Sequence, residues 1–154
     1  MNNFNILNLN QKQEILKKLK KQFGITNIPG ILVQRGTERI FLFQGSFSDK
    51  QLKELEYTVP VERIGIYFAK EQNNQIRLSI DGVHLLQNQI TKGFIELDEK
   101  QMQEWMSGNE LVINQSIRGF VIMKYKDDFI GTGKASENKI TNFIPKSRRL
   151  KIKD

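Results

Sequence analysis

Hydrophobic and polar residues follow a helical period near the start of the chain. In QKQEILKKLKKQF (residues 11–23) the apolar residues recur every three or four positions, and lysines fill the opposite face. Asn8 or Asn10 can cap this segment, and Gly24 can end it. The pattern predicts an amphipathic helix. Its lysines have two interpretations, a solvated helix face or an auxiliary contact surface for a ligand.

The period changes to that of strands after the turn at Pro29-Gly30. ILVQR (31–35) and RIFLF (39–43) flank a Gly-containing turn and predict a hairpin. A short helix is expected over residues 49–57, capped by Ser48. Together these elements predict a small α/β unit over residues 1–60, with Pro60 as the joint to the rest of the chain.

Residues 61–154 predict strands with two short helices among them. Apolar strands are expected at 63–69 and 75–80, and a brief one at 94–97. Asp81 can cap a helix that contains His84, and Asp98 can cap a helix that ends at Gly108. The apolar face of the second helix, formed by Met102, Trp105 and Met106, is expected in the core rather than as a base-stacking platform. A lone His in such a helix is more often packed than a metal ligand.

The last third of the chain predicts three consecutive strands. GFVIMKY (119–125) alternates in type, a second strand opens at Phe129, and a third covers 139–144 before Pro145. Asn138 is expected to supply the positive φ of the turn at Glu137-Asn138. Strands with interspersed helices predict an α+β fold.

Gly131 and Gly133 interrupt the middle strand of these three. Missing side chains allow a bulge or the close approach of a ligand. We expect Gly131 to meet a backbone requirement and Gly133 to keep the surface flat beside Lys134, so that Gly133→Val removes binding but leaves stability intact. A basic tail follows, which is either a solubilising end or part of the same site.

This last stretch resembles a known family. GFVIMKYKDDFIGTGKASENKITNFIPKSRR (119–149) is similar to the PUA-like RNA-binding domain of RsmF-type RNA cytosine methyltransferases of the Fmu/Sun family. In that family a strand leads to a glycine-flanked lysine, a turn, an Asn and then Pro-Lys and an Arg. The resemblance covers roughly the second half of the chain and implies a PUA-like β pseudo-barrel with short helices. The matching positions are Gly131, Gly133, Lys134, Asn142, Pro145, Lys146 and Arg149.

Composition narrows the classes of protein. The chain has 154 residues, no Cys and one His, which excludes disulfides and thiolate chemistry and argues against a structural metal. No apolar run is long enough for a membrane helix and no signal peptide is evident, so a cytoplasmic protein without a membrane partner is expected. The paired cysteines and glycine-rich cofactor site of the Fmu/Sun enzymes are missing. We therefore expect no enzyme, no catalytic residues and no cofactor.

The positive charge is concentrated at the two ends of the chain. Of the net charge of +7, residues 1–23 carry +4, residues 134–154 carry +5 and the middle carries −2. Such a distribution suits a phosphate footprint if the fold brings the two ends together. The RNA-binding residues expected from charge and resemblance are Gly131, Gly133, Lys134, Lys139, Asn142, Lys146, Arg148, Arg149, Lys151, Lys17, Lys20 and Lys21.

Two functions from different classes follow from these observations. The first is a stand-alone protein that binds structured rRNA or tRNA in RNA modification or ribosome maturation, where it could guide a separately encoded RNA-modifying enzyme. The second is a non-catalytic protein-interaction subunit of an RNA-processing complex, whose basic ends bind an acidic partner.

Overall fold

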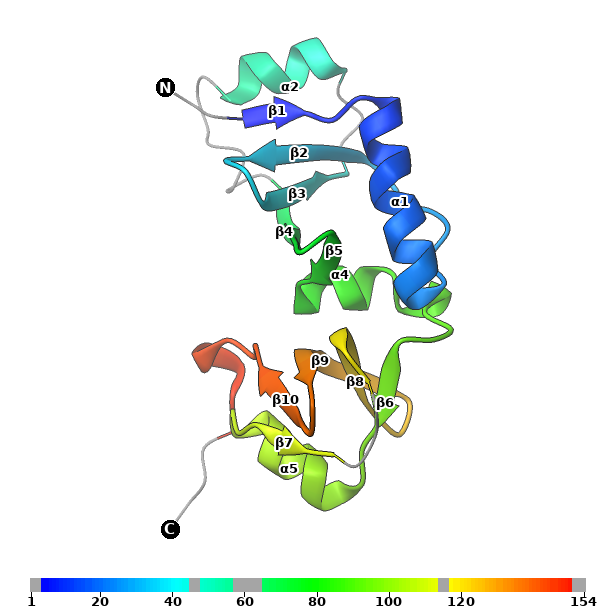
Figure 1. Ribbon diagram of the computed structural model, residues 1–154. Helices are drawn as coiled ribbons and strands as arrows, with labels where there is room; N and C mark the ends of the chain where they lie inside the picture. Colours follow the sequence, from blue (N-terminus) through cyan, green and yellow to red (C-terminus); the bar gives the residue numbers. More distant parts are fainter. Residues whose placement is uncertain (1–3, 45–47, 57–64, 114–116, 151–154) are drawn as a thin grey trace.

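The computed structural model describes residues 4–44, 48–56, 65–113 and 117–150. Within these residues the strands form two five-stranded sheets, one above the other in Figure 1. Both sheets occur with short helices, so the architecture is α+β, as the sequence predicted. The line where the two sheets meet, which we call the seam, positions the candidate site.

The first sheet takes its strands in chain order, and every neighbouring pair is antiparallel. The predicted hairpin forms its centre. Val33 and Phe43 of this hairpin pack against Leu52 of helix α2 (Asp49–Glu56) on one face. The strands are β1 (Phe4–Ile6), β2 (Ile31–Arg35), β3 (Arg39–Phe43), β4 (Ile66–Gln72) and β5 (Gln75–Leu78).

Helix α1 (Leu9–Phe23) packs on the first sheet as its periodicity predicts. Its buried residues Ile15, Leu19 and Phe23 join the core, and Asn8 and Gly24 cap its two ends. Gln22 on the same helix closes the edge of the sheet. Its side-chain amide donates to the Ile76 carbonyl at 2.9 Å and accepts from the Ile76 amide at 2.8 Å. The edge strand β5 is therefore satisfied by a side chain in place of another strand.

The second sheet has the strand order β6-β8-β9-β10-β7, with β6 parallel to β8 and the other pairs antiparallel. Helix α5 (Glu99–Met106), capped by Asp98 as predicted, packs its buried Trp105 into this sheet. The strands are β6 (Phe94–Glu96), β7 (Leu111–Val112), β8 (Gly119–Tyr125), β9 (Asp128–Ser136) and β10 (Lys139–Asn142).

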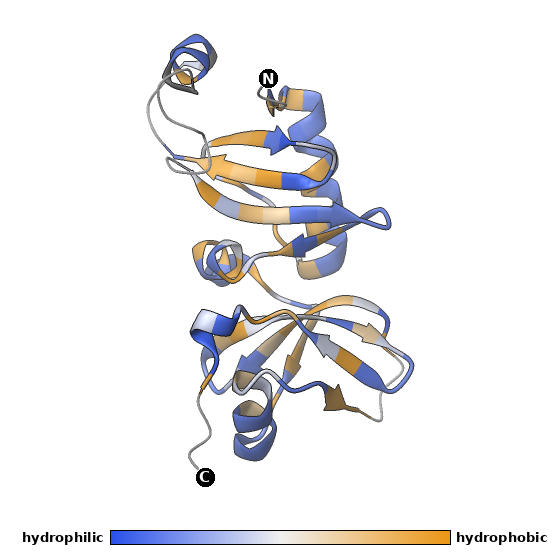
Figure 2. Cartoon of the chain, turned by 90° about the vertical axis from the view of Figure 1, so that its left-hand side faces the viewer, coloured by the Kyte–Doolittle hydropathy of each residue, from blue (hydrophilic) through white to orange (hydrophobic). Residues whose placement is uncertain are grey.

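Alternation in β8 places apolar residues on both of its faces. Val121 and Met123 belong to the core around Trp105, whereas Ile122 joins the core of the first sheet. Helix α4 (Ile80–Leu85) and the 3-10 turn η1 (Gln87–Gln89) lie between the two sheets. In Figure 2 apolar residues run through the strands of both sheets up to the seam. The two halves therefore share a core.

Several local expectations are corrected by the structure. Strand β4 pairs with β3 and β5 pairs with β4, so the first sheet continues to residue 78, beyond the joint expected at residue 60. Ser79 caps α4 in place of Asp81, because its hydroxyl accepts from the Gly82 amide at 2.9 Å. The positive φ in the β9–β10 turn belongs to Glu137 (52°). Strand β10 ends at Asn142, two residues before the predicted end.

Candidate nucleic-acid interface

A row of stacked aromatic and cationic side chains crosses the seam. Lys134 of β9 lies 5.8 Å from the centroid of the Phe120 ring on β8, its cross-strand neighbour. Phe120 lies 6.4 Å from Phe143, which follows β10. Arg77 of β5, in the first sheet, lies 4.2 Å above the Phe143 ring. Both sheets thus contribute to a continuous strip of π faces and positive charge.

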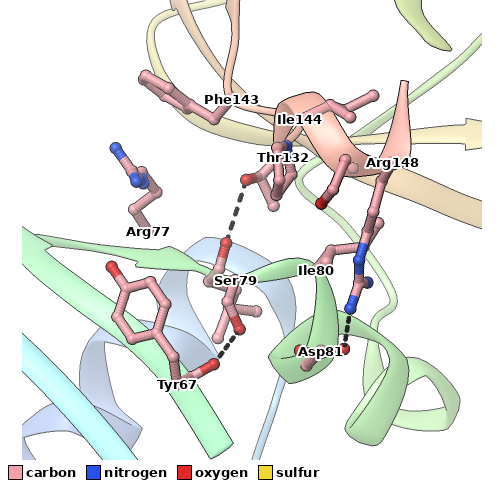
Figure 3. Close-up of a pocket in the computed structure, with 13 residues that line it drawn as sticks. Tyr67, Arg77, Ser79, Ile80, Asp81, Thr132, Phe143, Ile144 and Arg148 are labelled. Carbon is pink, nitrogen blue, oxygen red and sulfur yellow. Dashed lines mark hydrogen bonds and ion pairs between the residues drawn. The ribbon is translucent and has the colours of Figure 1, made fainter. Parts of the chain in front are cut away.

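A cavity of about 300 Å³ opens beside this strip. Its walls come from β4, β5, α4, β9 and the 3-10 turn η2 (Lys146–Arg148). Figure 3 shows Tyr67, Arg77 and Phe143 along one side of it, with Thr132 and Arg148 on the other. Thr132 is fixed there because its hydroxyl donates to the Leu78 carbonyl at 3.1 Å. The cavity is therefore lined by both sheets.

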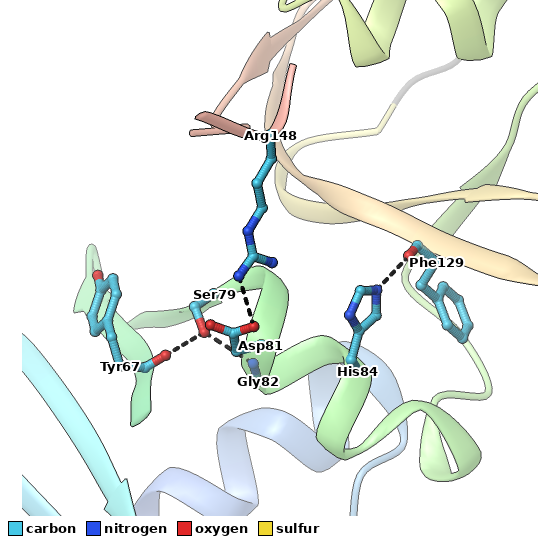
Figure 4. A network of polar contacts seen from close by, with 7 residues as sticks. All are labelled: Tyr67, Ser79, Asp81, Gly82, His84, Phe129 and Arg148. Atoms are coloured by element: carbon cyan, nitrogen blue, oxygen red, sulfur yellow. Dashed lines mark hydrogen bonds and ion pairs between the residues drawn. The ribbon is translucent and has the colours of Figure 1, made fainter. Parts of the chain in front are cut away.

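An ion pair crosses the rim of this cavity. Arg148 Nη2 lies 3.1 Å from the Asp81 carboxylate, and the two side chains are 43% and 49% exposed. Figure 4 shows this pair beside Ser79, whose hydroxyl donates to the Tyr67 carbonyl, and beside His84, whose Nε2 lies 2.9 Å from the Phe129 carbonyl. His84 thus ties α4 to β9. An exposed ion pair contributes little to stability, so Arg148 can exchange partners at low cost.

A second hollow, of about 410 Å³, lies next to Phe120. It is lined by Lys21 of α1, by Arg118 and by Gln75, whose side-chain oxygen accepts from the Phe120 amide at 3.3 Å. Gln75 and Arg77 are two residues apart on β5, so their side chains lie on the same face of the strand. This strand therefore connects the hollow to the cavity. We call the combined region the seam surface, defined by Lys21, Tyr67, Arg77, Arg118, Phe120, Lys134, Phe143 and Arg148.

The two glycines singled out from the sequence are buried beneath Trp105. A Cβ on Gly131 would lie 2.9 Å from the Trp105 Nε1 atom, and this glycine has a φ of +150°. A Cβ on Gly133 would lie 2.5 Å from the Thr141 carbonyl oxygen and 2.7 Å from the indole. The expectation of an open, flat surface at Gly133 is therefore wrong. Both glycines make room for the indole inside the core.

Asn142 is engaged in bonds that hold the chain together. Its amide nitrogen donates to the Trp105 carbonyl at 2.7 Å and to the Asn109 carbonyl at 3.0 Å. Its side-chain oxygen accepts from the Ile144 amide at 2.8 Å. The side chain thus joins the end of α5 to the end of β10, and the resemblance at this position has a structural basis.

We expect Asn142→Ala to lower the free energy of unfolding by about 2–3 kcal/mol, because three backbone groups lose their side-chain partner. Urea unfolding followed by Trp105 fluorescence measures the change. Asn138→Ala is the matched control, since Asn138 is exposed in the β9–β10 turn, and its cost should stay within about 0.5 kcal/mol. Equal midpoints for the two variants would show that these contacts do not stabilise the sheet.

The remaining basic residues of the tail differ in their surroundings. Lys139 and Lys146 are exposed, and Lys134 and Arg148 belong to the seam surface. Arg149 folds back onto the chain, where its Nε donates to the Ile144 carbonyl at 3.1 Å. Lys151 lies outside the described residues.

The basic residues of α1 divide between two sides of the helix. Lys21 lines the hollow of the seam surface, whereas Lys17 and Lys20 line a different depression with Thr26 and Asn27. Figure 1 shows α1 on the right of the molecule and η2, in red, on the left. The fold therefore keeps α1 and the basic segment that begins at Lys134 apart. The seam surface includes Lys21 from the first and Lys134 and Arg148 from the second.

Sequence reasoning missed several residues of the seam surface. Tyr67, Arg77, Arg118, Phe120 and Phe143 were not named as candidates. The signal for Arg77 was present, because QIRL places Arg77 opposite the apolar residues of an alternating strand. Nothing local indicates that β5 faces Phe143, which lies far along the chain.

Residues 92–150 match the family described as the methyltransferase RsmF PUA domain. These residues comprise the whole second sheet, with α5, Lys134, Phe143 and η2. This part of the chain therefore has the PUA-like fold of that family. The fold and the family expected from the sequence are thereby confirmed.

Known proteins extend the likeness into the first sheet. The chain is 30% identical over 142 residues to "Ribosomal RNA small subunit methyltransferase F" of Psychromonas ingrahamii, covering 88% of this chain and 28% of the relative. The protein of the same name from Vibrio cholerae is 29% identical over 144 residues, covering 93% of this chain and 29% of the relative. The chain thus spans less than a third of the length of these relatives. The likeness covers more than the second half expected from the sequence.

Metal-binding clusters and membrane-spanning helices are features of other functional classes. Among the described residues, no group of three or more His, Asp or Glu side chains is arranged to hold a metal ion. The helices in the described ranges are all too short or too polar to cross a bilayer.

Proposed function

We propose that this chain binds structured rRNA or tRNA in the cytoplasm during RNA modification or ribosome maturation, without catalysing a reaction itself. The seam surface is the proposed contact region. A PUA-like domain related to that of RsmF supports RNA binding connected with rRNA modification. A separately encoded modifying enzyme would be the partner that the bound RNA brings into place.

The observation that carries the proposal is the strip from Lys134 through Phe120 and Phe143 to Arg77. Phe120 itself is buried, 6% exposed, so the accessible flat faces of the strip are the half-buried Phe143 and the Arg77 guanidinium stacked on it. Cations attract the phosphate backbone, and aromatic rings with stacked guanidinium groups are the platforms on which unpaired bases lie. The strip sits on strands in a concave seam, where loops and ends of RNA can enter. A continuous duplex offers no unpaired base to stack.

We expect a hairpin RNA to bind at least about 10-fold more tightly than duplex DNA of matched length at the same salt, because only the hairpin presents unstacked bases. Fluorescence anisotropy titrations at several salt concentrations measure both affinities. Equal affinity for the two would reduce the interaction to generic polyanion binding.

The alternative, a subunit that binds an acidic protein, has a different signature. Purification before and after nuclease treatment separates the two functions. Copurifying material that absorbs at 260 nm and disappears with nuclease supports RNA binding. A second polypeptide that still copurifies after nuclease treatment would contradict the proposal and favour the protein-interaction function.

A further inference from the structure

We infer that the cavity between β5, α4 and β9 takes one unpaired nucleotide of the bound RNA, turned out of the helical stack. This inference rests on the proposed RNA binding and adds what the cavity recognises. Three observations support the inference: the size of the cavity, its stacking groups and the exchangeable ion pair at its rim.

The size of the cavity suits a single base with its sugar. Its volume of about 300 Å³ is at the lower end of the range for small-molecule pockets, roughly 300–1,000 Å³. A base pair would not fit in this space. The cavity also lies where two sheets meet, a common position for ligand sites.

The stacking groups are held in place by the fold. Arg77 is fixed above Phe143 at 4.2 Å, and the ring of Tyr67 lies beneath Arg77 in Figure 3. Tyr67 is itself braced by Phe41, whose ring centroid is 5.6 Å away. A planar guanidinium and an aromatic ring on the same side of a cavity provide two flat faces for a base.

Polar groups in the walls can read the edge of that base. No hydrogen bond within the described residues engages the Tyr67 hydroxyl, and Figure 3 shows it pointing toward Arg77. Ser147 lines the same cavity from η2. The Thr132 hydroxyl donates to Leu78 and keeps its lone pairs for accepting. A few hydroxyls around a stacked base are the usual means of fixing its orientation.

The rim offers a site for the phosphate of the same nucleotide. Within the described residues, the Arg148 side chain pairs only with Asp81, across an exposed contact. A phosphate can replace that carboxylate with bidentate geometry. Asp81 then competes with the phosphate for Arg148. Asp81→Asn should therefore tighten binding of the RNA by about 3-fold, since it removes the competing charge.

The test compares a hairpin RNA carrying one bulged nucleotide with the same hairpin from which that nucleotide is deleted, both titrated by fluorescence anisotropy. The bulged hairpin should bind about 10-fold more tightly, the gain of stacking one base. Arg77→Lys keeps the charge but loses the planar stacking face. The ratio of its affinities for the bulged and the deleted hairpin should therefore fall close to one.

Arg39→Ala is the matched control, because Arg39 is exposed on β3 away from the cavity, and its preference for the bulge should be unchanged. Equal native affinity for both hairpins would overturn the nucleotide pocket while leaving RNA binding intact. An undiminished preference in Arg77→Lys would also overturn it. Binding to neither hairpin would contradict the proposed function itself.

Discussion

Gly133→Ala is expected to lower the free energy of unfolding by about 3 kcal/mol or more, the largest single effect that the structure implies. The added Cβ would lie 2.5 Å from the Thr141 carbonyl oxygen, 2.6 Å from Ile140 and 2.7 Å from Trp105. Two of these neighbours belong to the paired strand β10 and the third to the fully buried indole. Overpacking costs 1–3 kcal/mol where neighbours can move, and here a backbone group would have to move.

Urea unfolding followed by Trp105 fluorescence measures this effect, and Gly36→Ala provides its control. Gly36 also has a positive φ, of 68°, but an added Cβ would meet nothing within 4 Å. Gly36→Ala should lower the free energy of unfolding by about 1 kcal/mol, because only the backbone conformation disfavours the new residue. Equal losses for the two variants would mean that the indole does not pack against Gly133.

Removing three cations from the seam surface is expected to weaken binding of a hairpin RNA by about 100-fold. The variant carries Arg77→Ala, Arg118→Ala and Lys134→Ala, which come from the first sheet, from the residue before β8 and from β9. Each lost phosphate contact costs roughly 1 kcal/mol, and the salt dependence should fall by about one unit per contact. Anisotropy titrations at four or more salt concentrations give both quantities.

The control for this variant removes the same charge elsewhere. Lys17, Lys20 and Lys53 are exposed on α1 and α2, away from the seam surface. Their combined replacement by Ala should change the affinity less than about 3-fold, because distant charges are screened at physiological salt. A larger loss in this control than in the seam variant would place RNA on the outer face of α1.

Local elements could be predicted because their signals are local. The cap and apolar period of α1 lie within sixteen residues, from Asn8 to Phe23. The structure selects Asn8 of the two expected caps, and Gly24 ends the helix as predicted. The same holds for α5 after Asp98 and for the two strands around Gly36. In each case neighbouring residues decide the conformation.

The role of Gly133 could not be predicted, because alternation in a strand defines two faces without saying which is covered. The sequence shows Gly133 beside Lys134 and suggests a shared exposed surface. In the structure Trp105 covers the face of Gly133, while Lys134 points to the opposite face beside Phe120. The covering residue lies on a helix that precedes the strand by more than twenty positions, so only tertiary packing reveals it.

The candidate site depends on the same kind of long-range contact. Strands β4 and β5 were both assigned to the second half of the chain, yet β4 pairs with β3 of the first sheet, and β5 beside it turns Arg77 toward Phe143. Charge counting favoured the chain ends, because it cannot show which cations lie beside aromatic rings. The seam surface therefore combines the predicted Lys21, Lys134 and Arg148 with residues that only the fold brings near them.

The central claim is that RNA lies along the seam, and ultraviolet cross-linking of a bound hairpin RNA tests it most directly. After nuclease and protease digestion, mass spectrometry locates the peptides that carry a nucleotide adduct. The account predicts adducts on the segments that hold Tyr67 and Phe143, whose rings line the cavity. Adducts confined to α1 or to the β2–β3 hairpin would contradict it.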